Sequence, residues 1–113
     1  MTLPKAARLT RRREFLRVQQ KGRRLFSGEV LVIALDSGHA RPRIGITVSS
    51  KIANAVGRNR VKRWVREAFR ALRDSLPAVD LVVIARKGAT EMGLGGVRKA
   101  LAAAAAALTE GRA

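Results

Sequence analysis

The chain has 113 residues, with 24 Lys and Arg against 8 Asp and Glu, a formal net charge of +16 and a pI near 12.0. It contains no cysteine, which excludes disulfides, thiolate nucleophiles and zinc–thiolate sites and fits a cytoplasmic protein. No stretch reaches the roughly 20 apolar residues that cross a bilayer, and the basic start lacks the apolar segment of a signal peptide. We therefore expect one domain over residues 1–113, with an ordered core at about 9–108, flexible ends at 1–8 and 109–113, and a polyanionic partner.

The first predicted element is a helix between Thr10, its N-cap, and Gly22, its stop. Phe15, Leu16 and Val18 give it an apolar side, and basic residues cover much of the rest. Residues 1–24 hold nine basic residues and one acid, so this helix lies in the first of two charge clusters.

A β region follows the first helix. Residues 29–35 form a nearly continuous apolar run, which is typical of a strand buried on most of both faces. The turn-forming residues 36–42 lead into 43–49, where apolar and small or polar residues alternate, and we expect this strand to pair antiparallel with 29–35. A short further strand is predicted around residues 24–26.

A basic helix is predicted to begin between Asn54 and Arg58 and to end before Pro77. Its core-facing stripe, at i, i+3, i+4 spacing, comprises Val61, Trp64, Val65, Ala68, Phe69 and Leu72. Its other side carries cations, namely Arg58, Lys62, Arg66 and Arg70 with Arg60, Arg63 and Arg73 beside them. Residues 51–73 hold eight basic residues and one acid, so one side of this helix can sit in a core while the other meets a polyanion.

The last third of the chain predicts a strand and a helix. Residues 80–86 are strongly apolar, and residues 97–108 form an alanine-rich helix. The glycines in 93–96 are interpreted as a flexible connector, because a phosphate loop would also need a Lys and a Ser or Thr. The order α-β-β-α-β-α, with a possible extra strand, predicts a two-layer α/β sandwich of helices on a mostly antiparallel sheet.

No catalytic constellation is visible in the sequence. His39, the one histidine, lies in the predicted hairpin loop, and the acids have no metal-ligand spacing. Nucleic-acid binding has better support, because arginine forks match phosphate oxygens. Asn59 fits a base edge or a helix cap, and Trp64 and Phe15 each fit either a base stack or the core. With four aromatic residues and no tyrosine, the affinity should be dominated by phosphates.

Residues 51–70 (KIANAVGRNRVKRWVREAFR) resemble the signature of the protein subunit of bacterial ribonuclease P around its Arg-Asn-Arg motif. The flanking segments 43–49 and 80–86 agree with that family, as does Arg13-Glu14-Phe15 followed by Gly22. The resemblance covers about residues 9–108. A bare Arg-Asn-Arg would not be specific, but the long central signature is.

The resemblance implies an αβββαβα fold in which the basic helix joins two parallel strands by a left-handed crossover, against the general preference. It also implies a role as the protein component of the ribonuclease P ribonucleoprotein, which removes the 5′ leader from precursor tRNA by endonucleolytic cleavage. The expected partners are the catalytic RNA and precursor tRNA, with no membrane and no protein partner. The RNA and its Mg²⁺ would perform the hydrolysis, no cofactor is expected on the protein, and the protein would lower the magnesium requirement.

The family's site residues carry over by position. Its RNA-contacting positions correspond to Lys51, Arg58, Asn59, Arg60, Lys62, Arg63 and Arg66. Its cleft for the single-stranded leader corresponds to Phe15, Val18, Gln19 and Ile33, with Arg11 and Arg12 beside them. Many relatives have aromatic residues where this chain has Gln19 and Ile33, so Phe15 is the best remaining stacking candidate.

Two other classes of function stay open at the level of the residues. A basic ribosomal or RNA-chaperone protein would use the same cationic face for structural RNA binding, and a DNA-binding module would place the basic helix in a major groove. A protein-only nuclease has the least support, because no active site can be assembled from the sequence.

Overall fold

The computed structural model describes residues 3–38 and 41–110, so the predicted loop residue His39 lies outside the described residues. The elements within that part of the chain are α1 (Arg12–Lys21), β1 (Arg23–Ser27), β2 (Val30–Asp36), β3 (Arg43–Thr47), α2 (Ala55–Leu72), β4 (Val79–Ala85) and α3 (Gly93–Glu110). Short 3-10 turns lie at Lys5–Ala7, Arg73–Ser75 and Ala89–Glu91. The predicted helices and strands are thereby confirmed, including the short strand that became β1.

The four strands form one sheet in the order β1-β2-β4-β3. β1 pairs antiparallel with β2 and β2 antiparallel with β4, whereas β3 pairs parallel with β4. The prediction that β3 pairs with β2 is therefore wrong, because β4 lies between them. β4 is buried along nearly all its length. A strand that is apolar on both faces is best buried in the middle of a sheet, and β4 has a neighbouring strand on each edge. α2 joins two adjacent parallel strands, as the family resemblance implied; the handedness of that crossover stays a prediction.

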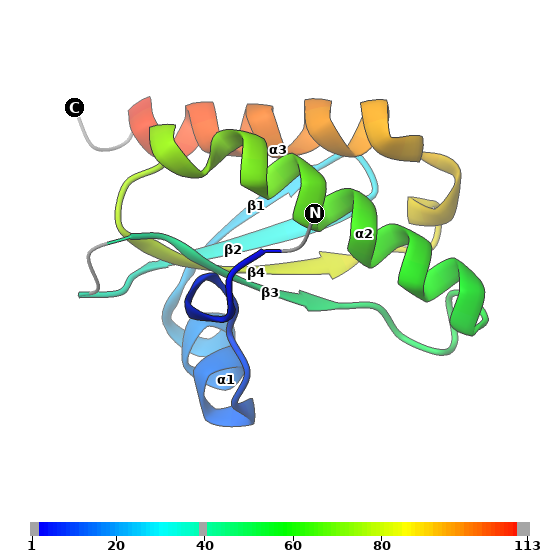
Figure 1. Ribbon diagram of the computed structural model, residues 1–113, viewed down its shortest axis with the longest axis horizontal. Coiled ribbons are helices and arrows are strands. Elements are labelled where there is room, and N and C mark those ends of the chain that lie inside the picture. The colour runs from blue at the N-terminus through cyan, green and yellow to red at the C-terminus, as the bar shows by residue number, and fades with distance from the viewer. Residues whose placement is uncertain (1–2, 39–40, 111–113) are drawn as a thin grey trace.

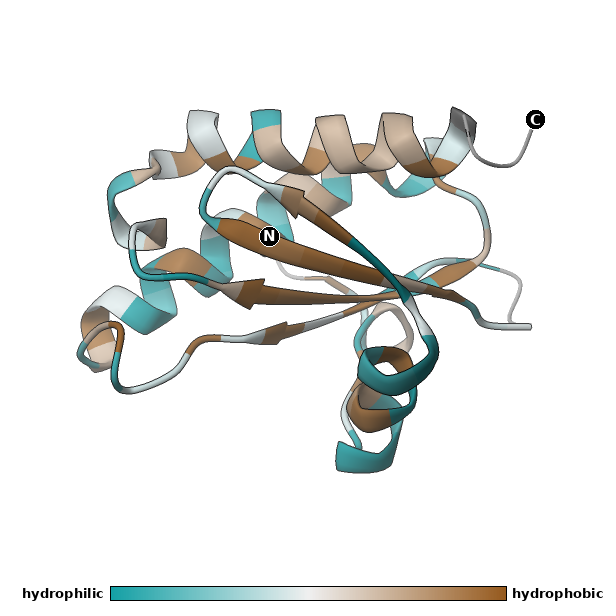
Figure 2. Ribbon diagram, turned by 180° about the vertical axis from the view of Figure 1, so that it is seen from behind, coloured by the Kyte–Doolittle hydropathy of each residue, from teal (hydrophilic) through white to brown (hydrophobic). Residues whose placement is uncertain are grey.

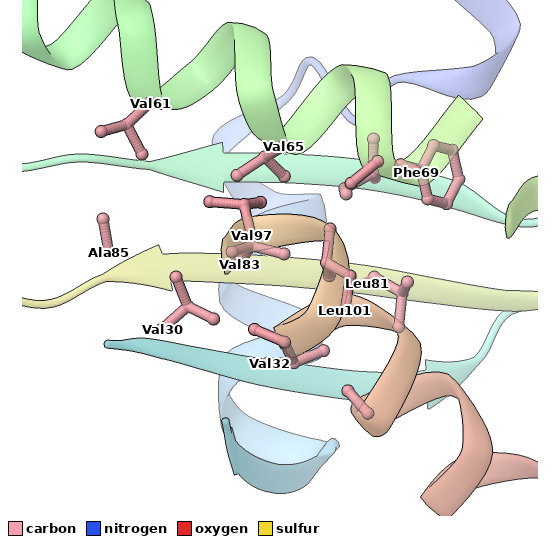
Figure 3. Packing of buried hydrophobic residues seen from close by; sticks show 14 of the residues in the cluster. Val30, Val32, Val61, Val65, Phe69, Leu81, Val83, Ala85, Val97 and Leu101 are labelled. Carbon is pink, nitrogen blue, oxygen red and sulfur yellow. The ribbon is translucent and has the colours of Figure 1, made fainter. Parts of the chain in front are cut away.

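α2 and α3 cover one face of the sheet, and α1 lies on the opposite face (Figure 1). The larger core lies under α2 and α3, where Val61 and Val65 of α2 point toward the strands beside Val83 (Figure 3). The predicted α2 stripe is confirmed: four of its members are buried, and Trp64 and Leu72 are half-buried against them. Trp64 is thus a core residue rather than an exposed stacking surface.

The smaller core lies between α1 and the opposite face of the sheet. Its buried members are Leu9, Val18, Leu31, Ile33 and Val82, with Phe15, Leu35 and Ile84 packed against them. Because α1 is short, it covers only part of this face of the sheet (Figure 1). The candidate site lies beside α1, where the sheet is not covered.

Residues 3–8, which the sequence prediction leaves outside the ordered core, pack onto the rest of the fold. Leu3 and Ala7 are buried in the larger core, and Arg8 forms a bridge with Ile44 of β3. The segment before α1 therefore contacts both the larger core and the edge strand β3.

Two helix boundaries differ from their predictions. The N-cap of α1 is Arg11 rather than Thr10, because the Glu14 carboxylate accepts from the backbone N–H of both residues and a threonine hydroxyl is not needed. α3 begins at Gly93, so the predicted connector is the first turn of this helix, and it continues to Glu110. The alanine run propagates a helix once it starts, and Gly93, with φ of 70°, supplies the bend into it.

Candidate nucleic-acid interface

A cleft of about 550 Å³ lies between α1 and α2 over β3. Its lining residues are Thr10, Arg12, Phe15, Leu16, Gln19, Ile46, Thr47, Val48 and Lys62. A smaller hollow of about 100 Å³ adjoins it, shares Phe15, Ile46 and Lys62, and adds Arg66. The two together make a groove with an apolar and aromatic floor and cations on both walls, which suits a single strand of nucleic acid.

Phe15 is the aromatic residue of this groove. It is half-buried, its ring packs against Gly45 of β3, and it still lines both hollows. The strand covers one part of the ring, which agrees with the interpretation of Phe15 as a core residue, and another part faces the groove. Its use as a stacking surface stays a prediction.

Two residues carried over to the cleft lie beneath it instead. Val18 is 1% exposed and Ile33 is 0% exposed, because both face the sheet interior beside Val82. This corrects the expected cleft lining, in which their side chains were accessible. Gln19 is half-buried and does line the cleft, whereas Arg11 is exposed outside it.

The cations of α2 divide into two sets. Lys62 and Arg66 are one turn apart and border the groove. Arg60 and Arg63 are exposed and line neither hollow, and the same is true of the neutral Asn59. The family resemblance assigned all these residues to RNA contact, which stays a prediction; the structure shows that Lys62 and Arg66 line the groove and that Arg60 and Arg63 do not.

Capping interactions at the start of α2 settle the role of Asn54 and restrict Arg58. Asn54 is the N-cap, and its side-chain oxygen accepts from the N–H of Gly57 at 2.9 Å, so Asn59 is free of the capping role. Arg58 Nη1 donates to the carbonyl of Ala53 at 2.9 Å, so part of its guanidinium is already used inside the protein.

Electrostatic compensation on α2 is slight. Among the described residues, the one ion pair on this helix joins Arg70 to Glu67 at 3.4 Å, and Arg60 and Arg63 have no such partner. Several exposed like charges on one helix repel one another, so binding of a polyanion relieves that repulsion.

A network of Glu14, Arg43 and Asp80 joins α1 to β3 and β4 of the sheet. Arg43 donates twice to Asp80, from Nε at 2.9 Å and from Nη2 at 2.8 Å, and its Nη1 donates to Glu14 at 3.0 Å. The hydrogen bonds to Asp80 raise the pKa of Arg43. The backbone N–H of Arg11 lowers the pKa of Glu14 most, with Thr10 and Arg43 adding to that effect against partial desolvation. These charges are satisfied internally, so they position α1 rather than bind a ligand.

The sequence and the described structure agree with a known family. A family model described as Ribonuclease P matches residues 3–109. The chain belongs to the ribonuclease P protein family. It is 41% identical over 90 residues to the ribonuclease P protein component of Syntrophus aciditrophicus (strain SB), an alignment that covers 80% of this chain and 76% of that relative. It is 46% identical over 87 residues to the one from Chlamydia trachomatis serovar D, covering 76% and 72%.

Solved structures of this family have the same fold. The ribonuclease P protein of Staphylococcus aureus superposes with a TM-score of 0.80 at 33% identity, covering 88% of this chain and 92% of that one. The protein from Thermotoga maritima gives 0.78 at 36% identity, covering 87% and 94%. As a ribonuclease P protein component, the chain is a subunit of the ribonuclease P enzyme and partners the ribonuclease P RNA, and a role in processing the tRNA 5′ leader fits the family.

Sequence reasoning missed several groove residues of this ribonuclease P protein. They are Thr10, Leu16, Ile46, Thr47 and Val48 in the cleft and Arg8, Leu9, Ile44 and Gly45 in the adjoining hollow. Five of the nine lie in β3 or directly after it, and no periodicity distinguishes a strand residue under a groove from one under a helix. Lys51, which the resemblance assigned to RNA contact, is exposed in the turn after β3 and does not line the groove.

No group of three or more His, Asp or Glu within residues 3–38 and 41–110 of the ribonuclease P protein is arranged to hold a metal ion. None of the described helices is long and apolar enough to cross a membrane.

Proposed function

We propose that this ribonuclease P protein binds two RNA segments at once, the ribonuclease P RNA on one flank of α2 and the single-stranded leader of precursor tRNA in the α1–α2 groove. The observation that carries the proposal is the division of the α2 cations. Arg60 and Arg63 face away from the core, whereas Lys62 and Arg66 border a groove that also holds Phe15.

The groove is suited to a single strand rather than to a duplex. Its volume of about 550 Å³ lies between α1 and α2 over β3, and its lining combines Phe15 with Arg12 and Lys62. An aromatic surface between cations recognises unpaired bases and their phosphates with little sequence preference. A leader that differs from one precursor tRNA to the next needs recognition of that kind.

The chemistry is proposed to reside on the RNA. Mg²⁺ bound by the ribonuclease P RNA would supply the activated water, and the protein would supply positioning and charge neutralisation. Cations placed beside crowded phosphates take over part of the counterion role, so less free Mg²⁺ should be needed for folding and substrate binding.

The test is cleavage of a precursor tRNA by a bacterial ribonuclease P RNA at low Mg²⁺, with and without the purified chain. We expect strong stimulation at the mature 5′ end and a weaker effect at high Mg²⁺. If the chain binds the RNA tightly but does not stimulate cleavage at any Mg²⁺ concentration, the leader-processing role is refuted and structural RNA binding remains.

A further inference from the structure

Phe26 is the most exposed large hydrophobic residue described, with 67% of its surface accessible. It lies on β1, the edge strand of the sheet, outside the groove described above. The guanidinium of Arg86 lies over its ring, 5.4 Å from the centroid. A cation at that distance from the ring face is attracted by the ring's quadrupole, so Arg86 fixes the ring's orientation without burying it.

The strand register connects Phe26 to the cleft. Phe26 pairs with Leu31 of β2, Leu31 with Ile84 of β4, and Ile84 with Thr47 of β3. Paired side chains lie on the same face of a sheet, and Leu31 and Ile84 belong to the core on the α1 side. Thr47 lines the cleft, so this row of four residues leads from the cleft across the sheet to Phe26, over three interstrand spacings or about 14 Å.

This part of the sheet is left open by α1. The row lies at the end of the sheet where β1, β3 and β4 finish, and none of the described helices covers that end on the α1 side (Figures 1 and 2). No described helix therefore lies between the cleft and β1 on this face (Figures 1 and 2), and a nucleic-acid strand that leaves the cleft toward β1 would pass over the apolar residues Leu31 and Ile84.

The charges around Phe26 suit a phosphate backbone. Arg24 lies two residues before Phe26, so it shares its face of β1, and it is exposed. Arg86 is also exposed, and no described carboxylate lies within ion-pair distance of it. Glu29 lies opposite Arg86 across the strands, where its carbonyl accepts from the backbone N–H of Arg86, but its carboxylate lies against Gly88 and forms no ion pair with Arg86. Phe26 is thus an aromatic surface beside two exposed arginines that form no ion pair with a described carboxylate, a pattern that binds single-stranded nucleic acid.

We propose that Phe26, oriented by Arg86, is a stacking platform for a base of the single-stranded leader at the far end of the groove. The proposal rests on the function proposed above and extends it to a second aromatic contact on the edge strand. It assigns to β1 a part in binding, and it explains why a large aromatic residue is held exposed beside a cation instead of being folded into the core.

The test measures the affinity of the complex of the full chain with ribonuclease P RNA for precursor tRNA, which carries a leader, and for the same tRNA without the leader. The variants are Phe26→Leu, which keeps an apolar side chain without a ring, and Phe26→Trp, which keeps an aromatic surface. A matched pair, Arg86→Ala and Arg98→Ala, removes one exposed arginine from the ring and one from α3. We expect Phe26→Leu to lose about five- to tenfold in affinity for the leader-bearing tRNA alone, as the removal of one base stack predicts.

The remaining outcomes separate the two proposals. Phe26→Trp should bind leader-bearing tRNA as tightly as the natural chain does. When the leader carries an abasic nucleotide at the stacked position, Phe26→Leu and the natural chain should bind it with equal affinity. If the natural complex does not prefer the leader-bearing tRNA, the proposed function itself fails. Two results would refute stacking on Phe26 while the natural complex still prefers the leader-bearing tRNA. One is a Phe26→Leu variant that retains the full preference, and the other is a difference in affinity between Phe26→Leu and the natural chain that persists for every abasic position along the leader. The contact with Arg86 would then only secure the edge strand.

Discussion

The ring of Phe15 on α1 and the backbone of Gly45 on β3 are in contact so close that no side chain fits between them. A methyl group placed on Gly45 would lie 2.5 Å from Cε2 and 2.6 Å from Cζ of Phe15. The absence of a side chain on the strand therefore sets how near α1 lies to the sheet, and with it the position of the aromatic floor of the groove.

Gly45→Ala should push the Phe15 ring out of its place. Overpacking of this kind costs about 1–3 kcal/mol, and we expect a lower midpoint in denaturant together with weaker binding of leader-bearing tRNA. The matched control is Gly95→Ala on α3, where an added methyl group has no neighbour within 4 Å and should stabilise the helix. Equal stability of the two variants would contradict the tight contact.

Asp80→Asn should destabilise the fold strongly, because Arg43 would keep its charge in a place where only 16% of its side chain is exposed. Removing one partner of such a pair costs about 2–4 kcal/mol, measured by chemical denaturation. Asp74→Asn breaks the solvent-exposed pair with Arg41 and is the control, with little change expected. A similar small change for both variants would show that the network does not hold α1.

The stability of the fold should fall at acidic pH through Glu14. Its pKa is below the ordinary value of 4.5 in the folded state, so the carboxylate stabilises the fold above that value and loses its contribution as the pH falls through the folded pKa. Thermal unfolding of the natural chain and of Glu14→Gln, followed from pH 7 to pH 2, should show a gap that closes toward the acid end. A gap that stays constant with pH would rule out this linkage.

Replacing Arg60 and Arg63 with alanine should weaken assembly with the ribonuclease P RNA. Affinity falls as salt rises, and each lost phosphate contact reduces the magnitude of the slope of log affinity against log salt by about 0.7–0.9. The double variant should therefore show a shallower salt dependence. Arg98 and Lys99 on α3 are exposed and carry the same charge, so the corresponding double alanine variant is the control. Unchanged affinity after loss of Arg60 and Arg63 would refute the proposed contact of the ribonuclease P RNA with these two residues of α2.

Gln19→Tyr should add a ring to the groove, because Gln19 is half-buried in its lining. A stack on an unpaired base contributes about 1–3 kcal/mol, so binding of leader-bearing tRNA should tighten fivefold or more while leaderless tRNA is unaffected. Gln20→Tyr, on the exposed neighbouring position, is the control. Equal gains from both variants would point to nonspecific contacts of an added aromatic residue.

Several features of this protein were available from the sequence alone. The spacing of Val61, Val65 and Phe69 predicted which side of α2 is buried, and the density of cations on the rest of that helix predicted a polyanionic partner. The long motif around Arg58-Asn59-Arg60 predicted the family. These properties are local, because helical periodicity and charge density are decided within a few turns of one segment.

Strand neighbours and exposure were decided by the tertiary structure. The alternation in 43–49 predicts a strand but not its partner, and β4, more than 30 residues further along, took the place beside β2. Val18 and Ile33 look like cleft residues by position, but packing of α1 on the sheet buries both. The row from Thr47 to Phe26 joins four strands, so it has no counterpart in any single segment. Long-range pairing and burial depend on which surfaces meet, and only the folded chain brings those surfaces together.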